Sequence, residues 1–162
     1  MDLLDVNWIA ELAILASVAV AMVLGGVVGY ERELRGRAAG FRTHMLIAGS
    51  AALLLGMTDL IAEHFNQEMY AARVQIDPVR IIEAMVTAIA FIGAGTIIQH
   101  ARSDVVLGLT TAASLLFTVS IGIAVGLGHL VLGVGVTLLA LITLHLVSGP
   151  KPVDPEGSQR ED

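Results

Sequence analysis

The feature that most limits the folds open to this 162-residue chain is the run from residue 105 to 150, 46 residues without Asp, Glu, Lys or Arg. The apolar core of a bilayer is about 30 Å thick and needs roughly 20 helical residues, so the run is too long for one membrane span and suits two. Over the whole chain 15% of the residues are charged, against about a quarter in soluble domains. We therefore expect a membrane protein.

Three further apolar stretches precede this run, and Gly126-Leu127-Gly128-His129 is the expected break within it. Backbone in lipid must satisfy its own hydrogen bonds, and the stretches are too continuous for barrel strands, so we expect an all-α bundle. The prediction is a single transmembrane domain, 1–149, followed by a disordered cytoplasmic tail, 150–162. Its five helices are predicted at approximately 10–30, 44–62, 78–99, 105–126 and 130–149.

Basic residues are distributed unequally between the two ends of these predicted helices. Seven Lys and Arg residues fall on the side of the 31–43 loop, the 100–104 loop and the tail, and two fall on the other side. Because basic loops stay in the cytoplasm, the N-terminus is expected outside and the C-terminus inside. The net charge of −6 argues against a nucleic-acid partner.

Small residues recur at every fourth position of two predicted helices, at 13, 17, 21, 25 and 29 and at 110, 114, 118, 122 and 126. In lipid, such ridges let helix backbones approach closely, so we expect tight packing within the chain and consider a homo-oligomer. The glycines expected to lie at close helix contacts are Gly25, Gly29, Gly93, Gly95, Gly122 and Gly126.

Charged residues and glycines alternate in the 29–44 segment, and the predicted topology brings the start of the fourth helix to the same membrane face. Charges at the headgroup level must be paired or hydrated, so we expect one hydrogen-bonded cluster there. The sequence is compatible with two roles for this cluster: a functional site, or a set of salt bridges that anchors the topology of the chain in the membrane. Its expected members are Glu31, Arg32, Glu33, Arg37, Arg42, Thr43, His44, Thr110 and Thr111.

A few other polar residues have simpler interpretations. Asp77, directly before Pro78, is typical of a helix cap, and an external ion or ligand site with Arg80 is the alternative. Asp59 lies within a predicted span without a local partner, which makes it a functional candidate. The five histidines show no metal-binding spacing and no catalytic triad is recognisable, so we expect neither an enzyme nor a cofactor and assign no metal site.

Five sequence blocks occur in order between about Gly25 and Gly128: GYERELRGRAAGFRTHML, DPVRI, FIGAGTII, GLTTAASL and IGIAVGLG. They closely resemble the MgtC/SapB family of bacterial membrane proteins. The chain has Ala88, Ala90 and Leu116 where the family often has glycine, glycine and tryptophan. Larger, virulence-associated members have asparagine at the position of Thr110 and carry a C-terminal soluble domain, which we do not expect in this short chain.

The resemblance implies a protein of the bacterial inner membrane, embedded in the lipid bilayer and linked to growth or survival at low magnesium. Some members of the family are described as modulators of the F-type ATP synthase. The leading interpretation is therefore a non-enzymatic protein that modulates another membrane complex. The alternative is a small oligomeric transporter or channel for Mg²⁺ or another ion. Conduction needs a polar path, and only the fourth helix offers hydroxyls for one, at Thr110, Ser114, Thr118 and Ser120.

The predicted topology can be tested with reporter fusions after Gln67 and after Gly149, which should report opposite sides of the membrane. With five spans and the N-terminus outside, the first fusion lies outside and the second in the cytoplasm. A fusion after Gly36 is the internal reference and should agree with the one after Gly149. If the fusions at 67 and 149 report the same side, the number of spans is even or the break at 126–129 is misplaced.

Overall fold

The computed structural model describes residues 8–65, 77–98 and 108–146, and within these ranges every regular element is a helix. The helices are α1 (Trp8–Leu34), α2 (Phe41–Phe65), α3 (Pro78–Ile98), α4 (Leu109–Gly126) and α5 (Leu130–Leu146). The prediction of an all-α bundle of five helices is confirmed, and so is the break at 126–129. Four helices are long and apolar enough to span a membrane. The fifth, α5, has 17 residues, the lower end of the spanning range.

The two boundaries beside the first turn differ from the predicted ones. α1 continues to Leu34 instead of ending near residue 30, and α2 begins at Phe41 instead of 44. The predicted helix boundaries were placed where the apolar residues end. Glu, Arg and Leu are good helix formers whether or not they lie in lipid, so the helices extend further.

In addition, α2 extends to Phe65 instead of 62, and α4 begins at Leu109, after Gly108, instead of at 105. Residues 105–107, where the fourth helix was expected to begin, and the predicted tail at 150–162 lie outside the described residues.

Glycine ends α1 through its backbone conformation. Gly36 has a φ of 63°, and the backbone N–H of Arg37 donates to the carbonyl of Arg32 at 3.0 Å while that of Gly36 donates to Glu33 at 2.9 Å. This is the Schellman arrangement, which satisfies the last carbonyls of a helix. The same bonding pattern around Gly128 ends α4, which explains why the chain can turn at 126–129.

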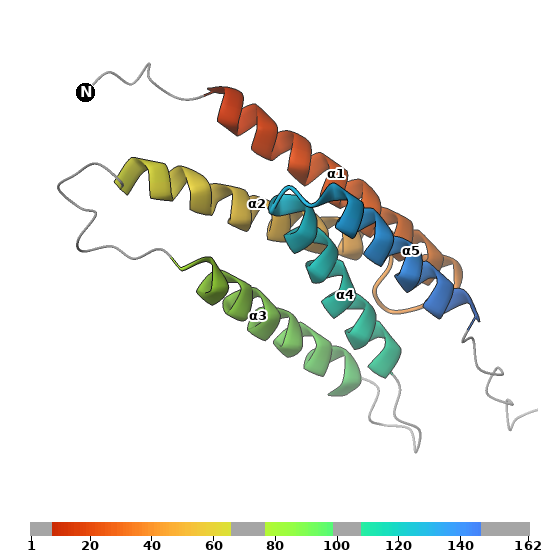
Figure 1. Cartoon of the computed structure of the whole chain (residues 1–162). Coiled ribbons are helices and arrows are strands. Elements are labelled where there is room, and N and C mark those ends of the chain that lie inside the picture. Colours follow the sequence, from red (N-terminus) through yellow and green to blue (C-terminus); the bar gives the residue numbers. More distant parts are fainter. Residues whose placement is uncertain (1–7, 66–76, 99–107, 147–162) are drawn as a thin grey trace, which may run out of the picture.

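The fourth helix, α4, lies at the centre of the bundle and contacts each of the other four helices (Figure 1). One side of it, at Leu115 and Val119, packs on apolar side chains of α2 and α3. On another side Ile121 packs with Val28 of α1 and Ala140 of α5. α1 and α2 form the most extensive helix pair, whereas α3 rests mainly on α4 and touches α2 only marginally.

Glycines let the helix backbones meet where α4 and α1 cross α2. A Cβ atom added to Gly122 would strike the carbonyl oxygen of Ala48, and one added to Gly25 would lie 2.6 Å from the carbonyl oxygen of His44. Close contacts with backbone atoms of α2 or the turn before it also occur at Gly29 and Gly126. A looser contact joins α3 to α4 at Gly93, where a Cβ would lie 3.1 Å from the Cβ of Ala112.

The expectation of close packing at Gly95 is wrong, because a Cβ added there would have nothing within 4 Å in the described part of the chain. Gly93, two residues earlier, faces Ala112 of α4. Two residues correspond to roughly 200° of rotation around a helix, so Gly95 lies on the opposite side of α3.

The packing can be tested by the same substitution at two helical glycines. Gly122→Ala should lower the free energy of unfolding by about 1–3 kcal/mol, because the new methyl group overlaps a backbone carbonyl. Gly135→Ala on α5 has open space and should be neutral, or stabilise by up to about 1 kcal/mol through helix propensity. Unfolding of the two variants in detergent measures the difference. Equal stability of both would contradict close packing at Gly122.

Candidate functional site

Polar side chains gather at one end of the bundle, where α1 and α5 end and α2 and α4 begin (Figure 1). One ion pair lies within α1, one side-chain hydrogen bond joins α1 to α5, and another joins α2 to α4; one fully buried arginine lies among these side chains. We call this group the charged cluster; its members are Glu31, Arg32, Arg35, His44, Ser114 and His145.

Arg32 is the largest fully buried side chain in the described part of the chain, with 2% of its surface exposed. It follows Val28 by one helical turn and therefore continues the buried face of α1. Its Nε and Nη2 atoms are buried without a hydrogen-bond partner among the described residues. A buried, unpaired charge costs several kcal/mol, so stability alone does not account for Arg32.

Glu31 and Arg35 form an ion pair four residues apart on α1. Arg35 also donates from Nη2 to Nδ1 of His145 at 3.2 Å, which joins the end of α1 to the end of α5. Arg35 and Arg37 are both close enough to Arg32 to repel its charge, and Glu31 is close enough to attract it. Of the charges on described residues within electrostatic reach of Arg32, two are positive and one is negative, so positive charge is in excess there.

His44 links α2 to α4 from a fully buried position. Its Nδ1 donates to the carbonyl oxygen of Gly40 at 2.9 Å, so this nitrogen carries the proton. In the neutral ring, Nε2 then accepts from the hydroxyl of Ser114, 3.2 Å away. The hydroxyl can alternatively donate to the carbonyl of Thr111 at 2.8 Å, and it has one proton for these two acceptors.

Glu33 has a structural role beside the cluster. Its Oε2 accepts a hydrogen bond of 2.8 Å from the backbone N–H of Phe41, the first residue of α2. The first N–H groups of a helix lack partners within the helix and favour negative charge. The carboxylate at the end of α1 therefore caps α2 and holds the 36–40 turn in place.

The structure brings together only part of the cluster that the sequence predicts. Glu31, Arg32 and His44 belong to it, and Thr111 is buried beside Ser114. The expected hydrogen bonds to the others are absent from the described part of the chain, so that part of the prediction is wrong. These exposed residues are Arg37, Arg42, Thr43 and Thr110.

The reason is the early start of α2. Because Phe41 already begins the helix, Arg42, Thr43 and His44 point in directions about 100° apart, and only His44 points inward. The prediction missed Arg35, Ser114 and His145 as members. The four-residue spacing from Glu31 could have indicated Arg35, but no local pattern pairs Ser114 with His44 or His145 with Arg35.

The other candidate residues lie away from the cluster. Oδ1 of Asp77 accepts from the backbone N–H of Val79 at 3.0 Å, the geometry of a helix cap, and Arg80 is exposed. Asp59 is exposed on α2. Among the described residues, no three His, Asp or Glu side chains are arranged to hold a metal ion.

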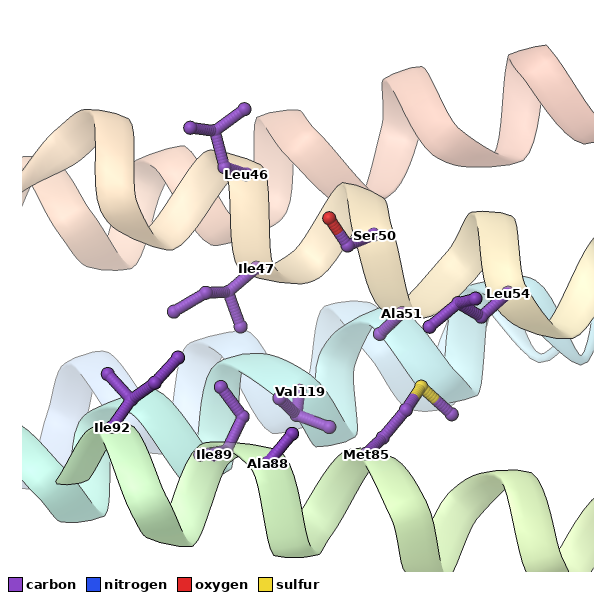
Figure 2. Close-up of a pocket in the computed structure, with 10 residues that line it drawn as sticks. All are labelled: Leu46, Ile47, Ser50, Ala51, Leu54, Met85, Ala88, Ile89, Ile92 and Val119. Atoms are coloured by element: carbon purple, nitrogen blue, oxygen red, sulfur yellow. The ribbon is translucent and has the colours of Figure 1, made fainter. Parts of the chain in front are cut away.

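Two grooves open between the helices. The first, of about 240 Å³, lies between α2 and α3 (Figure 2). Figure 2 shows Met85 of α3 pointing toward Leu54 and Ala51 of α2, and Ser50 supplies the one hydroxyl among otherwise apolar lining residues. The second, of about 130 Å³, lies between α1, α4 and α5 and reaches the charged cluster at Ser114. It is lined by Val28, Thr110, Ala113, Ser114, Phe117, Ala140, Thr143 and Leu144.

The contact between His44 and Ser114 can be tested by removing one hydroxyl. Ser114→Ala should destabilise the protein by about 1–3 kcal/mol, because it leaves the buried Nε2 of His44 without its hydrogen-bond partner. Ser120→Ala is the matched control on the same helix. Its hydroxyl is exposed and bonds only its own helix at Leu116, so a change below about 0.5 kcal/mol is expected in the same unfolding assay. Equal effects of the two substitutions would contradict the inter-helix role of Ser114.

Comparison with known proteins gives a consistent match. Residues 18–150 match the model of the MgtC family. The putative magnesium transporter YhiD of Escherichia coli is 37% identical over 128 residues, which are 78% of this chain and 57% of YhiD. Protein SapB of Bacillus subtilis is 30% identical over 157 residues, 96% of this chain and 66% of SapB. Protein MgtC of Brucella abortus is 34% identical over 113 residues, 70% of this chain and 42% of that protein.

The chain spans less than two thirds of the length of each of these relatives. No solved structure matches it significantly. The family model nevertheless covers all of α4 and α5, where the bundle has its centre, and most of α1 together with the whole charged cluster. The chain is therefore a membrane protein that belongs to the MgtC family.

Proposed function

We propose that this chain is a non-enzymatic protein of a bacterial inner membrane that supports growth at low magnesium by modulating another membrane complex, such as the F-type ATP synthase. The magnesium link comes from the family and from a relative named as a putative magnesium transporter. The observation that carries the proposal is the separation of charge from the bundle interior. The charged cluster lies at one end, while the groove between α2 and α3 is apolar except for Ser50. The second groove is lined mostly by apolar residues and contains no charged side chain from the described residues.

The hydroxyls of α4 support a role other than conduction. An ion crossing the bilayer needs oxygen atoms in place of its water shell. Thr118 and Ser120 each donate to a carbonyl of their own helix, and the hydroxyl of Ser114 lies between such a carbonyl and Nε2 of His44. Thr118 is fully buried against neighbouring helices and Ser120 is exposed on another side. These three hydroxyls therefore do not line one continuous path within the described part of a single chain.

The exposed arginines beside the cluster supply a surface for a partner. Arg37 lies in the turn between α1 and α2 and Arg42 lies in the first turn of α2, and both are exposed. Glu33 and His44 hold the turn through hydrogen bonds to the backbone of Phe41 and Gly40. By the distribution of basic residues this end is expected in the cytoplasm. A rigid turn that presents two free guanidinium groups suits a partner with acidic side chains.

The second candidate function is an oligomeric magnesium transporter. The printed name of the YhiD relative favours it. Asp59 of this chain also favours a transporter. It is exposed on α2 within a candidate membrane span, and in an oligomer it would face a pathway shared between the subunits.

Growth at low magnesium tests the leading proposal. In a bacterium that has lost its copy of this gene, the double variant Arg37→Ala/Arg42→Ala should fail to restore growth at low magnesium while reaching normal abundance in the membrane. Arg80→Ala, an exposed arginine at the other end of the bundle, is the matched control and should restore growth. Full rescue by the double variant would contradict the partner surface. Mg²⁺ flux into proteoliposomes that contain only this protein, lost in Asp59→Asn, would support the transporter instead.

A further inference from the structure

We infer that Arg32 binds the phosphate group of a membrane phospholipid, one acyl chain of which lies in the groove between α1, α4 and α5. This inference goes beyond the proposed function, because it concerns the buried part of the cluster and holds whichever partner or ion the protein serves.

The two unpaired atoms of Arg32 form one edge of its guanidinium group. Nε–H and the N–H of Nη2 lie on the same edge of a guanidinium group and point in parallel. This edge binds two oxygen atoms of a phosphate or carboxylate at once. In Arg32 both atoms of the edge are buried without a hydrogen-bond partner among the described residues. These two N–H groups are therefore a buried pair of adjacent donors, and a group with two acceptor oxygens fits them.

The side chains around Arg32 do not supply that group. Glu31 is adjacent in sequence, and neighbouring residues on a helix do not face each other. Its carboxylate is instead paired with Arg35, one turn further along α1. The carboxylate of Glu33 caps α2. Glu31 thus attracts Arg32 without hydrogen-bonding to it; apart from the ion pair with Arg35, both of its carboxylate oxygens are buried without a hydrogen-bond partner among the described residues.

The charge around Arg32 favours an anion. Arg35 and Arg37 lie within electrostatic reach of Arg32, and both add positive charge to that of Arg32 itself. Glu31 offsets one of the three charges. A phosphodiester carries one negative charge, so it would reduce the excess without reversing it, and burial strengthens the attraction because the local dielectric constant is low.

The groove beside the cluster indicates that the phosphate belongs to a lipid. It shares Ser114 with the charged cluster, and it contains Val28, which lies one turn, roughly 6 Å, before Arg32 on the same face of α1. Most of its lining is apolar, and its volume of about 130 Å³ suits part of an acyl chain. Phe117 and Thr143 at its border are exposed on the side of the bundle, where lipid surrounds a membrane protein.

A soluble anion fits these observations less well. Neither unpaired nitrogen of Arg32 is exposed to water, so binding needs a small adjustment of the side chains around it. The groove is where the packing already leaves space next to the cluster. A lipid that enters the groove from the side has its phosphate at the headgroup level of the bilayer. The last turn of α1 and the first turn of α4 are expected at the same level.

The test uses the purified full chain in detergent and three probes: dioleoylphosphatidylglycerol, dioleoylglycerol and inorganic phosphate. Binding is measured by native mass spectrometry and by the shift of the thermal unfolding temperature. We expect phosphatidylglycerol to bind and to raise this temperature. Dioleoylglycerol has the same chains without the phosphate and should have little effect. If it stabilises the protein equally, Arg32 is not the receptor. If inorganic phosphate stabilises the protein equally at matched occupancy, the inference that the bound phosphate belongs to a lipid is contradicted.

Two variants separate the phosphate site from the groove. Arg32→Gln removes the charge and should weaken phosphatidylglycerol binding by about tenfold or more. Arg80→Gln, the same change at an exposed arginine, should leave binding unchanged. Ala113→Leu keeps Arg32 but fills the groove, and should weaken binding of the lipid as well.

If Arg32→Gln does not fold, Ala113→Leu decides the question, because its residue lies at the exposed border of α4. Undiminished phosphatidylglycerol binding by Ala113→Leu, or by a folded Arg32→Gln variant, would overturn the inference. Neither result depends on growth at low magnesium, so the inference and the proposed function can fail separately.

Discussion

The contact on which the bundle depends is the crossing of α4 over α2, where Gly122 meets the backbone of Ala48. In lipid, apolar surface gains little by leaving its surroundings, so helices associate through close van der Waals packing of their backbones. Because α4 contacts every other helix, its position against α2 sets the positions of the remaining three. A side chain at residue 122 would therefore disturb more than one pair of helices.

The same crossing aligns the polar groups. His44 precedes Ala48 by one turn on α2, and Ser114 precedes Gly122 by about two turns on α4. Residues at these spacings lie on one helix face, so the glycine contact brings His44 opposite Ser114. Arg32 is buried at this end because the face of α1 that packs on α2, through Gly25 and Gly29, continues into its last turn. The charged cluster is thus a consequence of apolar packing as much as of charge pairing.

Local patterns in the sequence were sufficient for the helices and for several of their contacts. Charge-free runs predict five helices, and glycines at four-residue spacing predict the contacts of Gly25 and Gly122. The same patterns could not say which side of α3 faces α4, and so Gly95 was misplaced. They also could not locate the first residue of α2, which decides whether Arg42 or His44 points inward. The pairing of His44 with Ser114 joins residues far apart in sequence and depends on the register of two helices, which no local pattern contains.

The position of α3 has a mechanical consequence. The backbone of this helix lies mainly against α4, and it meets α2 chiefly through side chains such as Met85, so a change in its angle leaves the contacts among the other four helices in place. A helix adapts to a thicker or thinner bilayer by changing its tilt, at a small energetic cost. When bilayer thickness changes, a tilt of α3 should therefore widen or narrow the groove that it shares with α2.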